Sequence, residues 1–193
     1  MEIKIKGKKP EIRFLYDMKK VLYDQKWLKK ALNFPVYYIY RGVKKRGELR
    51  YDITIILHKV LGQEFLKTKG HKHQKKFGEL LEVLEGKALY LFQKSRNKEV
   101  TDCYVIKAEK GDYIIVPANY HHLTINPSKK KLIMGNWISE KSRNVYDFFE
   151  RLQGACYYYT KSGWIKNRNY KKIPKLRFKK PLKKMPKNLD FLK

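Results

Sequence analysis

Residues 70–79 of this 193-residue chain read Gly-His-Lys-His-Gln-Lys-Lys-Phe-Gly-Glu. Residues two apart in a β-strand face the same side, so His71 and His73 can hold one ion together. Glu79 begins the next apolar run, and the loop before it can return its carboxylate to that face. These residue types in this pattern indicate a metal site carried by strands.

A second pair of histidines lies in the run Gly111-Asp-Tyr-Ile-Ile-Val-Pro-Ala-Asn-Tyr-His-His-Leu-Thr-Ile-Asn126. Adjacent residues of a strand point to opposite faces, so only one of His121 and His122 can join the site. Either pair on its own would fit solvated surface residues equally well. The two pairs together, with Glu79 and the framing glycines and proline, form a much more specific pattern.

The two segments resemble the paired signatures of the cupin superfamily, whose fold is a double-stranded β-helix, or jelly-roll barrel. The first signature is a glycine, His-x-His, a glutamate and a further glycine; the spacer before Glu79 is slightly long here. The second signature places a glycine, proline, histidine and asparagine in the register of Gly111, Pro117, His122 and Asn126. This register selects His122 over His121, although Asn119 stands where a glycine is usual.

The region around the histidines, residues 36–138, has the texture of a β protein, because short runs of strand-forming residues alternate with turn residues. Many short strands at regular spacing predict an antiparallel sandwich or small barrel. The expected strands are 36–40, 51–57, 64–68, 79–84, 88–92, 100–106, 113–116, 123–125 and 131–138.

The flanking segments divide the chain into an arm and helix at 1–35, the barrel with its closing elements at 36–165, and a tail at 166–193. The arm alternates apolar and basic residues to position 16, and apolar spacing predicts a helix over 17–33. A short helix over 148–153 and a hairpin around Gly163 follow the barrel. The tail is basic and rich in proline, and we expect it to lie extended along the body or to be partly disordered. Truncation after Phe178 is expected to leave the melting temperature nearly unchanged.

The charge balance, 46 Lys+Arg against 18 Asp+Glu with a formal net charge of +28, favours anionic ligands or partners. Two cysteines are too few for a disulfide framework and lack metal-ligand spacing. The start of the chain has no apolar signal stretch, and no apolar run is long enough to span a membrane. We therefore expect a cytoplasmic protein without membrane contact.

A narrower resemblance is to the archaeal cupin-type glucose-6-phosphate isomerases. It is carried by Thr68-Lys-Gly-His-x-His73 with Thr54 fourteen residues earlier, by Asp17-Met18 and by Pro35-Val-Tyr-Tyr38. This resemblance implies an archaeal-type isomerase of glycolysis and gluconeogenesis, acting on glucose 6-phosphate and fructose 6-phosphate. We also expect a homodimer.

The resemblance implies a divalent metal, iron(II) or else zinc, manganese or nickel, held by His71, His73, Glu79 and His122. Glu79 is also the catalytic candidate, as a base if hydrogen moves between C1 and C2 as a proton, or only as a ligand if it moves as hydride. The implied substrate- and phosphate-binding residues are Tyr38, Thr54, Thr68, Gly70, Arg143 and Tyr146.

Three positions depart from the family pattern. Leu81 replaces a tyrosine expected two residues after the metal-binding glutamate, and Trp137 stands where a tyrosine is expected at the end of the last barrel strand. Arg143 lies roughly where the family has a histidine, and its guanidinium would suit a phosphate or a second acidic group. Because the hydroxyl near the reacting carbons is missing at position 81, the resemblance leaves open both the exact substrate and whether the protein turns it over.

Three other functions compete with the isomerase. A non-catalytic cupin that binds a phosphorylated ligand is favoured by Leu81 and Trp137. An oxygen-using iron cupin would suit a two-histidine, one-carboxylate triad better than the three histidines here. A nucleic-acid-binding cupin is favoured by the net charge and by the tail, where Tyr170 and Phe178 stand among lysines.

Overall fold

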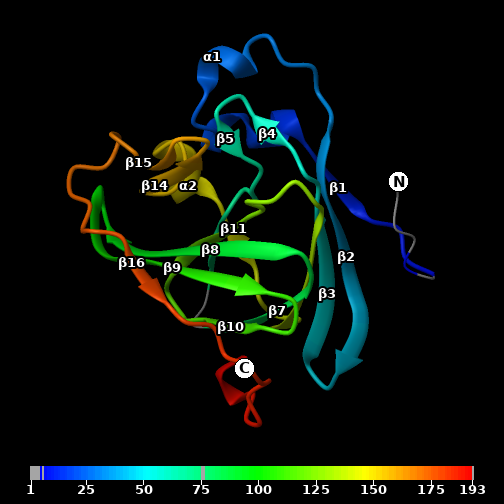
Figure 1. Ribbon diagram of the computed structural model, residues 1–193. Coiled ribbons are helices and arrows are strands. Elements are labelled where there is room, and N and C mark those ends of the chain that lie inside the picture. The colour runs from blue at the N-terminus through cyan, green and yellow to red at the C-terminus, as the bar shows by residue number, and fades with distance from the viewer. Residues whose placement is uncertain (1–4, 6, 75–76, 193) are drawn as a thin grey trace.

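The computed structural model describes residues 5, 7–74 and 77–192, and it confirms the predicted mainly-β jelly-roll barrel. Residues 1–4 and 6 of the predicted arm, residues 75–76 of the loop before Glu79, and residue 193 lie outside the described part. Two antiparallel sheets form the barrel walls (Figure 1). The larger sheet contains, in spatial order, β1 (Glu11–Phe14), β2 (Pro35–Arg46), β3 (Leu49–Ile56), β12 (Leu132–Ser139), β7 (Glu79–Glu85) and β10 (Tyr113–Val116).

The second wall is a four-stranded sheet, in which three strands are antiparallel and the tail adds a fourth. Its order is β11 (His121–Ile125), β8 (Lys87–Arg96), β9 (Glu99–Glu109) and β16 (Arg177–Lys179). Residues 88–93 of β8 are all buried rather than alternating, because this strand is covered on both of its faces. Gln93 shows the outer cover: its Oε1 accepts from the Cys156 N–H at 2.7 Å, and its Nε2 donates to the Tyr170 hydroxyl.

Smaller elements close the ends of the barrel. A four-stranded sheet orders β15 (Gly163–Lys166), β14 (Tyr157–Thr160), β5 (Glu64–Phe65) and β4 (Val60–Leu61), and it contains the hairpin predicted around Gly163. The short helix expected over 148–153 is α2 (Asp147–Arg151). A two-stranded pair joins β13 (Asn144–Val145) to β6 (Lys72–His73). In the described part of the chain, no helix has the length and apolar character needed to cross a bilayer.

The single helix predicted over 17–33 is wrong. The structure has a 3-10 helix, η1 (Leu15–Val21), then an extended residue, Leu22, and a short α1 (Gln25–Leu28). Leu15, Met18 and Val21 are all fully buried, and a spacing of three residues aligns them on one face of a helix with three residues per turn. The second turn starts afresh at Asp24, whose carboxylate accepts from the Trp27 N–H at 2.9 Å.

The basic tail lies along the barrel, which is one of the two predicted outcomes. Its packing conflicts with the expectation that the tail is dispensable for folding. The strand β16 pairs in parallel with β9, and Leu182 forms a bridge with Tyr113 on β10. Near its end, a 3-10 turn, η2 (Asp190–Leu192), buries Leu192 completely against Leu49 and Leu80. The tail therefore supplies part of a small second core. Figure 1 shows it running from β16 to the end of the barrel near β10.

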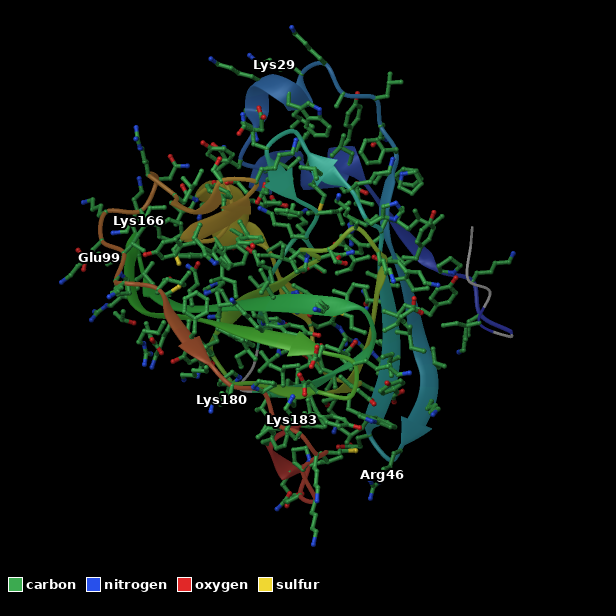
Figure 2. The ribbon with its side chains drawn as sticks, in the orientation of Figure 1. Lys29, Arg46, Glu99, Lys166, Lys180 and Lys183 are labelled. Atoms are coloured by element: carbon green, nitrogen blue, oxygen red, sulfur yellow. The ribbon has the colours of Figure 1, made fainter. Side chains whose placement is uncertain are left out.

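Much of the excess positive charge lies on the surface. Figure 2 shows Lys29, Lys166 and Lys180 at the edge of the molecule, and all three side chains are exposed. Within the tail, Lys183 forms an ion pair, because its ammonium contacts the buried Asp112 carboxylate at 2.7 Å.

The packing of the tail leads to a first prediction. Replacement of Leu192 by alanine is expected to lower the free energy of unfolding by about 2–4 kcal/mol, because it opens a cavity against Leu49 and Leu80. The corresponding fall in melting temperature is roughly 4–16 °C for a chain of this size. Met185→Ala, in the same segment but 38% exposed, is the control and should leave the melting temperature nearly unchanged. Equal melting temperatures for the two variants would contradict the observed packing.

Candidate metal centre and ligand cavity

Four side chains from three parts of the sheet framework converge at one point. His71 and His73 come from the edge of β6, Glu79 is the first residue of β7, and His122 lies on β11. One possible ligand atom from each lies within 4.8 Å of the other three. The Glu79 Oε2 atom is 3.1 Å from Nε2 of His122 and 3.4 Å from Nε2 of His73. His121 faces the other way, with its ring 4.4 Å from the ring of Phe148.

Hydrogen bonds to the main chain position these side chains without a bound ligand. The amide of His71 donates to the His122 carbonyl at 3.0 Å, and the amide of His122 donates back to the His71 carbonyl at 2.9 Å. Nδ1 of His73 lies 3.2 Å from the carbonyl oxygen of Phe77, which can only accept a hydrogen bond. The proton therefore belongs on Nδ1, and Nε2 keeps its lone pair toward the cluster.

Gly70 has a conformation that the site requires. Its φ is +77°, and a Cβ at this position would come within 2.6 Å of the Phe149 ring. A larger residue would clash with Phe149 of α2 and press on Leu123, 3.0 Å away and directly after His122. This is a physical reason for glycine directly before the His-x-His pattern.

The electrostatics of the cluster favour a neutral His71 beside an ionised Glu79 carboxylate. Burial lowers the pKa of His71 well below its ordinary value, and the neighbouring His122 lowers it further. Burial raises the pKa of Glu79, but the His122 and His73 nitrogens lower it more strongly, so that it lies well below the usual range. Burial lowers the pKa of His73, but the Glu79 carboxylate raises it more, so that it lies above its ordinary value. A carboxylate and neutral imidazoles are the protonation states in which these groups bind metal.

The contacts within the cluster also fit a cation. Although two imidazole nitrogens approach Oε2 of Glu79, this buried atom accepts no well-formed hydrogen bond from the described residues. Nε2 of His71 and Nε2 of His73 lie 3.3 Å apart, with a lone pair expected on the latter. A divalent ion bound by these atoms would satisfy the orphaned oxygen and the facing nitrogens together.

A cavity of about 650 Å³, counting its open mouth, lies beside the cluster. Of the residues predicted to bind substrate or phosphate, Thr54, Thr68, Gly70 and Tyr146 line it, together with His71, Glu79 and His122. Leu81 also lines it, so an apolar side chain does occupy the position where a hydroxyl was expected.

Two predicted binding residues do not line the cavity. Tyr37, Ile39 and Arg41 face it from β2, so Tyr38 points to the other side of the strand. Arg143 is exposed, and its Nη1 donates to the main-chain carbonyls of Glu140 and Ser142 at 2.8 and 3.0 Å.

The neighbour of Arg143, Asn144, lines the cavity instead, because Asn144 pairs with His73 through β13 and β6. Trp137 does not face the cavity either; it packs with Leu49 and Leu80, while Ile138 takes the inward position on β12.

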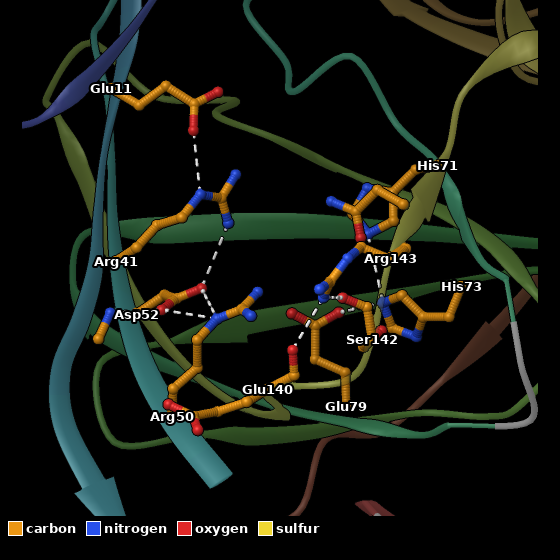
Figure 3. Close-up of polar contacts among 12 residues, drawn as sticks. Glu11, Arg41, Arg50, Asp52, His71, His73, Glu79, Glu140, Ser142 and Arg143 are labelled. Carbon is orange, nitrogen blue, oxygen red and sulfur yellow. Dashed lines mark hydrogen bonds and ion pairs between the residues drawn. The ribbon is translucent and has the colours of Figure 1, made fainter. Parts of the chain in front are cut away.

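Sequence reasoning missed a charged group on the cavity wall. Arg41, Arg50 and Asp52 all line the cavity, and the Asp52 carboxylate lies between the two guanidinium groups (Figure 3). The signal was available, because Arg50 and Asp52 precede Thr54 by four and two residues on the same strand. Alternation places all three on the face to which Thr54 had been assigned.

The family model and the curated relatives that match this chain agree in one family. The family model described as glucose-6-phosphate isomerase matches residues 13–175. The glucose-6-phosphate isomerase of Pyrococcus abyssi is 34% identical over 135 residues, which cover 67% of this chain and 69% of that protein. The enzyme of Thermococcus litoralis is 32% identical over 135 residues, with the same two shares. Among solved structures, recombinant oxalate oxidase in complex with glycolate is 14% identical, with a TM-score of 0.47 over 57% of this chain and 55% of that chain.

The geometry of the cluster leads to a second prediction. His122→Ala is expected to remove the bound divalent ion, because it deletes one of the four converging ligand atoms. His121→Ala is the matched control, since this side chain packs against Phe148 on the opposite face and should keep the ion. Elemental analysis of the purified variants measures the ion directly. Equal metal content in both variants would show that His122 is not a ligand.

Proposed function

We propose that this chain, which belongs to the glucose-6-phosphate isomerase family, interconverts glucose 6-phosphate and fructose 6-phosphate in the cavity beside the histidine cluster. One observation supports this reading above the others. The four converging metal-ligand atoms and the polar groups of Thr54, Thr68 and Gly70 belong to a single cavity. A phosphorylated sugar bound there would place its carbons beside the cluster.

His71, His73, Glu79 and His122 would hold the ion, and we propose iron(II). Three imidazoles and one carboxylate suit first-row divalent ions, with zinc, manganese and nickel as the other candidates. When bound, such an ion acts as a Lewis acid that stabilises negative charge on the sugar oxygens at C1 and C2.

The phosphate end of the substrate is assigned to the part of the cavity around Thr68. Its Oγ1 accepts from the Thr124 N–H at 3.0 Å, so its own hydrogen remains available to a phosphate oxygen. The Thr54 hydroxyl has no hydrogen-bond partner among the described residues. Burial raises the pKa of the nearby Tyr37 to about 12, which keeps this hydroxyl protonated as a donor. The Lys69 ammonium lies over the Tyr146 ring at 5.2 Å, but it is paired with the Glu150 carboxylate at 2.6 Å.

Isomerisation moves one hydrogen between C1 and C2 and shifts the carbonyl group. Glu79 is ionised and lines the cavity, so it can take the proton from one carbon and return it to the other. If the hydrogen moves as hydride, Glu79 serves only as a ligand. Turnover in deuterated water separates these routes, because only proton transfer can introduce solvent deuterium at the reacting carbon.

The finer features of the proposal are a homodimer, a cytoplasmic location and contact of the basic tail with polyanions. The tail carries twelve Lys or Arg residues within 166–193 and a single acidic one, Asp190. Clustered exposed cations of this kind favour salt-sensitive binding to polyanions.

The third prediction tests the activity. Metal-loaded protein should convert fructose 6-phosphate to glucose 6-phosphate, measured by a coupled dehydrogenase assay, and removal of the ion by a chelator should abolish this conversion. Glu79→Gln should lose turnover, with metal content measured in parallel to separate a lost base from a lost ligand. Thr54→Val is expected to raise KM more than it lowers kcat, because it removes a group assigned to the phosphate. Loaded protein that neither converts nor binds a hexose phosphate would refute the proposed function.

The fourth prediction concerns Leu81. This side chain is buried and lines the cavity, where it offers no hydrogen bond to the sugar. Since positioned acid–base groups typically contribute about 10²–10⁴-fold, Leu81→Tyr should raise kcat/KM for fructose 6-phosphate by about tenfold or more. Leu81→Phe is the matched control, with the same ring but without the hydroxyl, and it should give no such gain. An equal gain in both variants would attribute the effect to ring packing.

A further inference from the structure

Arg50 is held in the cavity wall by a buried carboxylate. Its Nε donates to Asp52 at 3.0 Å and 3.2 Å, one distance to each carboxylate oxygen. Asp52 is only 2% exposed and also accepts from the Gly42 N–H at 2.8 Å and from Arg41 at 3.4 Å. The carboxylate is thus fully used in orienting its neighbours, and it holds Arg50 through Nε alone.

The two terminal nitrogens of Arg50 remain unused. Neither has a hydrogen-bond partner among the described residues, and the side chain is 19% exposed within a residue that lines the cavity. Figure 3 shows the Arg50 guanidinium and the Glu79 carboxylate directed toward one another. No ion pair joins them, so a space separates the free donors of Arg50 from the cluster.

The sheet register places Arg50 at the level of the cluster and away from the phosphate end. Arg50 pairs with Ile138 on β12, and the adjacent Trp137 pairs with Leu80 on β7, directly after Glu79. Arg50 and Glu79 are therefore two strands apart, about 10 Å across the sheet. Thr54 lies four residues further along β3 on the same face, about 13 Å from Arg50 along the strand. The cavity thus has hydroxyl donors at one end and a guanidinium at the other.

We propose that Arg50, oriented by Asp52, forms a second anion subsite that binds a planar two-oxygen group, a carboxylate or an enediolate, at the sugar end of a phosphorylated ligand. The inference rests on the proposed function, because that function assigns the phosphate to the Thr54 end. A guanidinium presents parallel N–H groups that match two oxygens in one plane, which an ammonium group does not. The same donors face the position where negative charge develops on the sugar oxygens during isomerisation.

The test compares two probes that differ only at the end facing Arg50: 6-phosphogluconate, which carries a carboxylate there, and sorbitol 6-phosphate, which carries a hydroxyl. Calorimetric titration of metal-loaded wild-type protein should show 6-phosphogluconate binding about 10–100-fold more tightly, as expected for charge-assisted hydrogen bonds. Arg50→Met should reduce this preference about tenfold or more while changing the affinity for sorbitol 6-phosphate by no more than about twofold.

Two further variants sharpen the comparison. Arg50→Lys keeps the charge but lacks the fork, so it should retain only part of the preference. Arg46→Met, an exposed arginine of the β2–β3 hairpin, is the matched control and should keep all of it. Metal content and melting temperature are measured for each variant, so that only folded, loaded proteins are compared.

A preference that survives Arg50→Met unchanged would overturn the subsite, because the ion alone would then account for it. Wild-type protein that binds sorbitol 6-phosphate but shows no preference for 6-phosphogluconate would also overturn it, while leaving the proposed function intact. Failure of both probes to bind the wild-type protein would refute the proposed function itself, and the subsite with it.

Discussion

The site depends on one stretch of main chain, residues 66–73, which is hydrogen-bonded along β11. Asn126 donates to the Leu66 carbonyl at 2.8 Å, Thr68 donates to the Thr124 carbonyl at 2.8 Å, and His71 exchanges two bonds with His122. These bonds bring two segments that are far apart in the sequence, residues 66–73 and β11, into direct contact. They place a histidine from each segment at one point and turn Thr68 and Gly70 into the cavity at the same time. The three histidines of the cluster and the proposed phosphate donors Thr68 and Gly70 are therefore positioned by one constraint.

A buried ion pair anchors the same stretch from outside. Lys67, between Leu66 and Thr68, is only 2% exposed; its ammonium donates to the Val21 carbonyl at 2.9 Å and pairs with the Glu64 carboxylate. Glu64 in turn accepts from the Tyr23 N–H at 2.9 Å. Removal of either charge would leave the other uncompensated in the interior, which is far more costly than the pair itself. The N-terminal 3-10 helix is thereby connected to the site without contributing a residue to the cavity.

The sequence predicted the barrel and the convergence of the metal ligands well, because both rest on period-two alternation and on a register read from two motifs. The differences at the cavity lining are shifts of one position. A shift of one residue along a strand turns a side chain to the opposite face, so Tyr37 lines the cavity where Tyr38 was expected. Asn144 likewise lines the cavity in place of the adjacent Arg143. The helix over 17–33 failed for another reason: the apolar spacing of three, at Leu15, Met18 and Val21, is that of a 3-10 helix. Tertiary contacts through Lys67 and Glu64 fixed that segment, and local pattern could not show them.

The register of the larger sheet also bears on the loss of the hydroxyl at position 81. Asn136 pairs with Leu81 on one side and with Asp52 on the other, so these three residues form a row across the cavity wall. Leu81 makes the β7 end of this row apolar, whereas Asp52 and the arginines that it orients make the β3 end strongly polar. Hydrogen-bonding capacity that is missing beside Glu79 on β7 is thus present two strands away in the same wall, on β3. A ligand bound in the cavity would meet polar partners on β3, so the proposed choice of sugar rests on Arg50 and Asp52 as much as on Leu81.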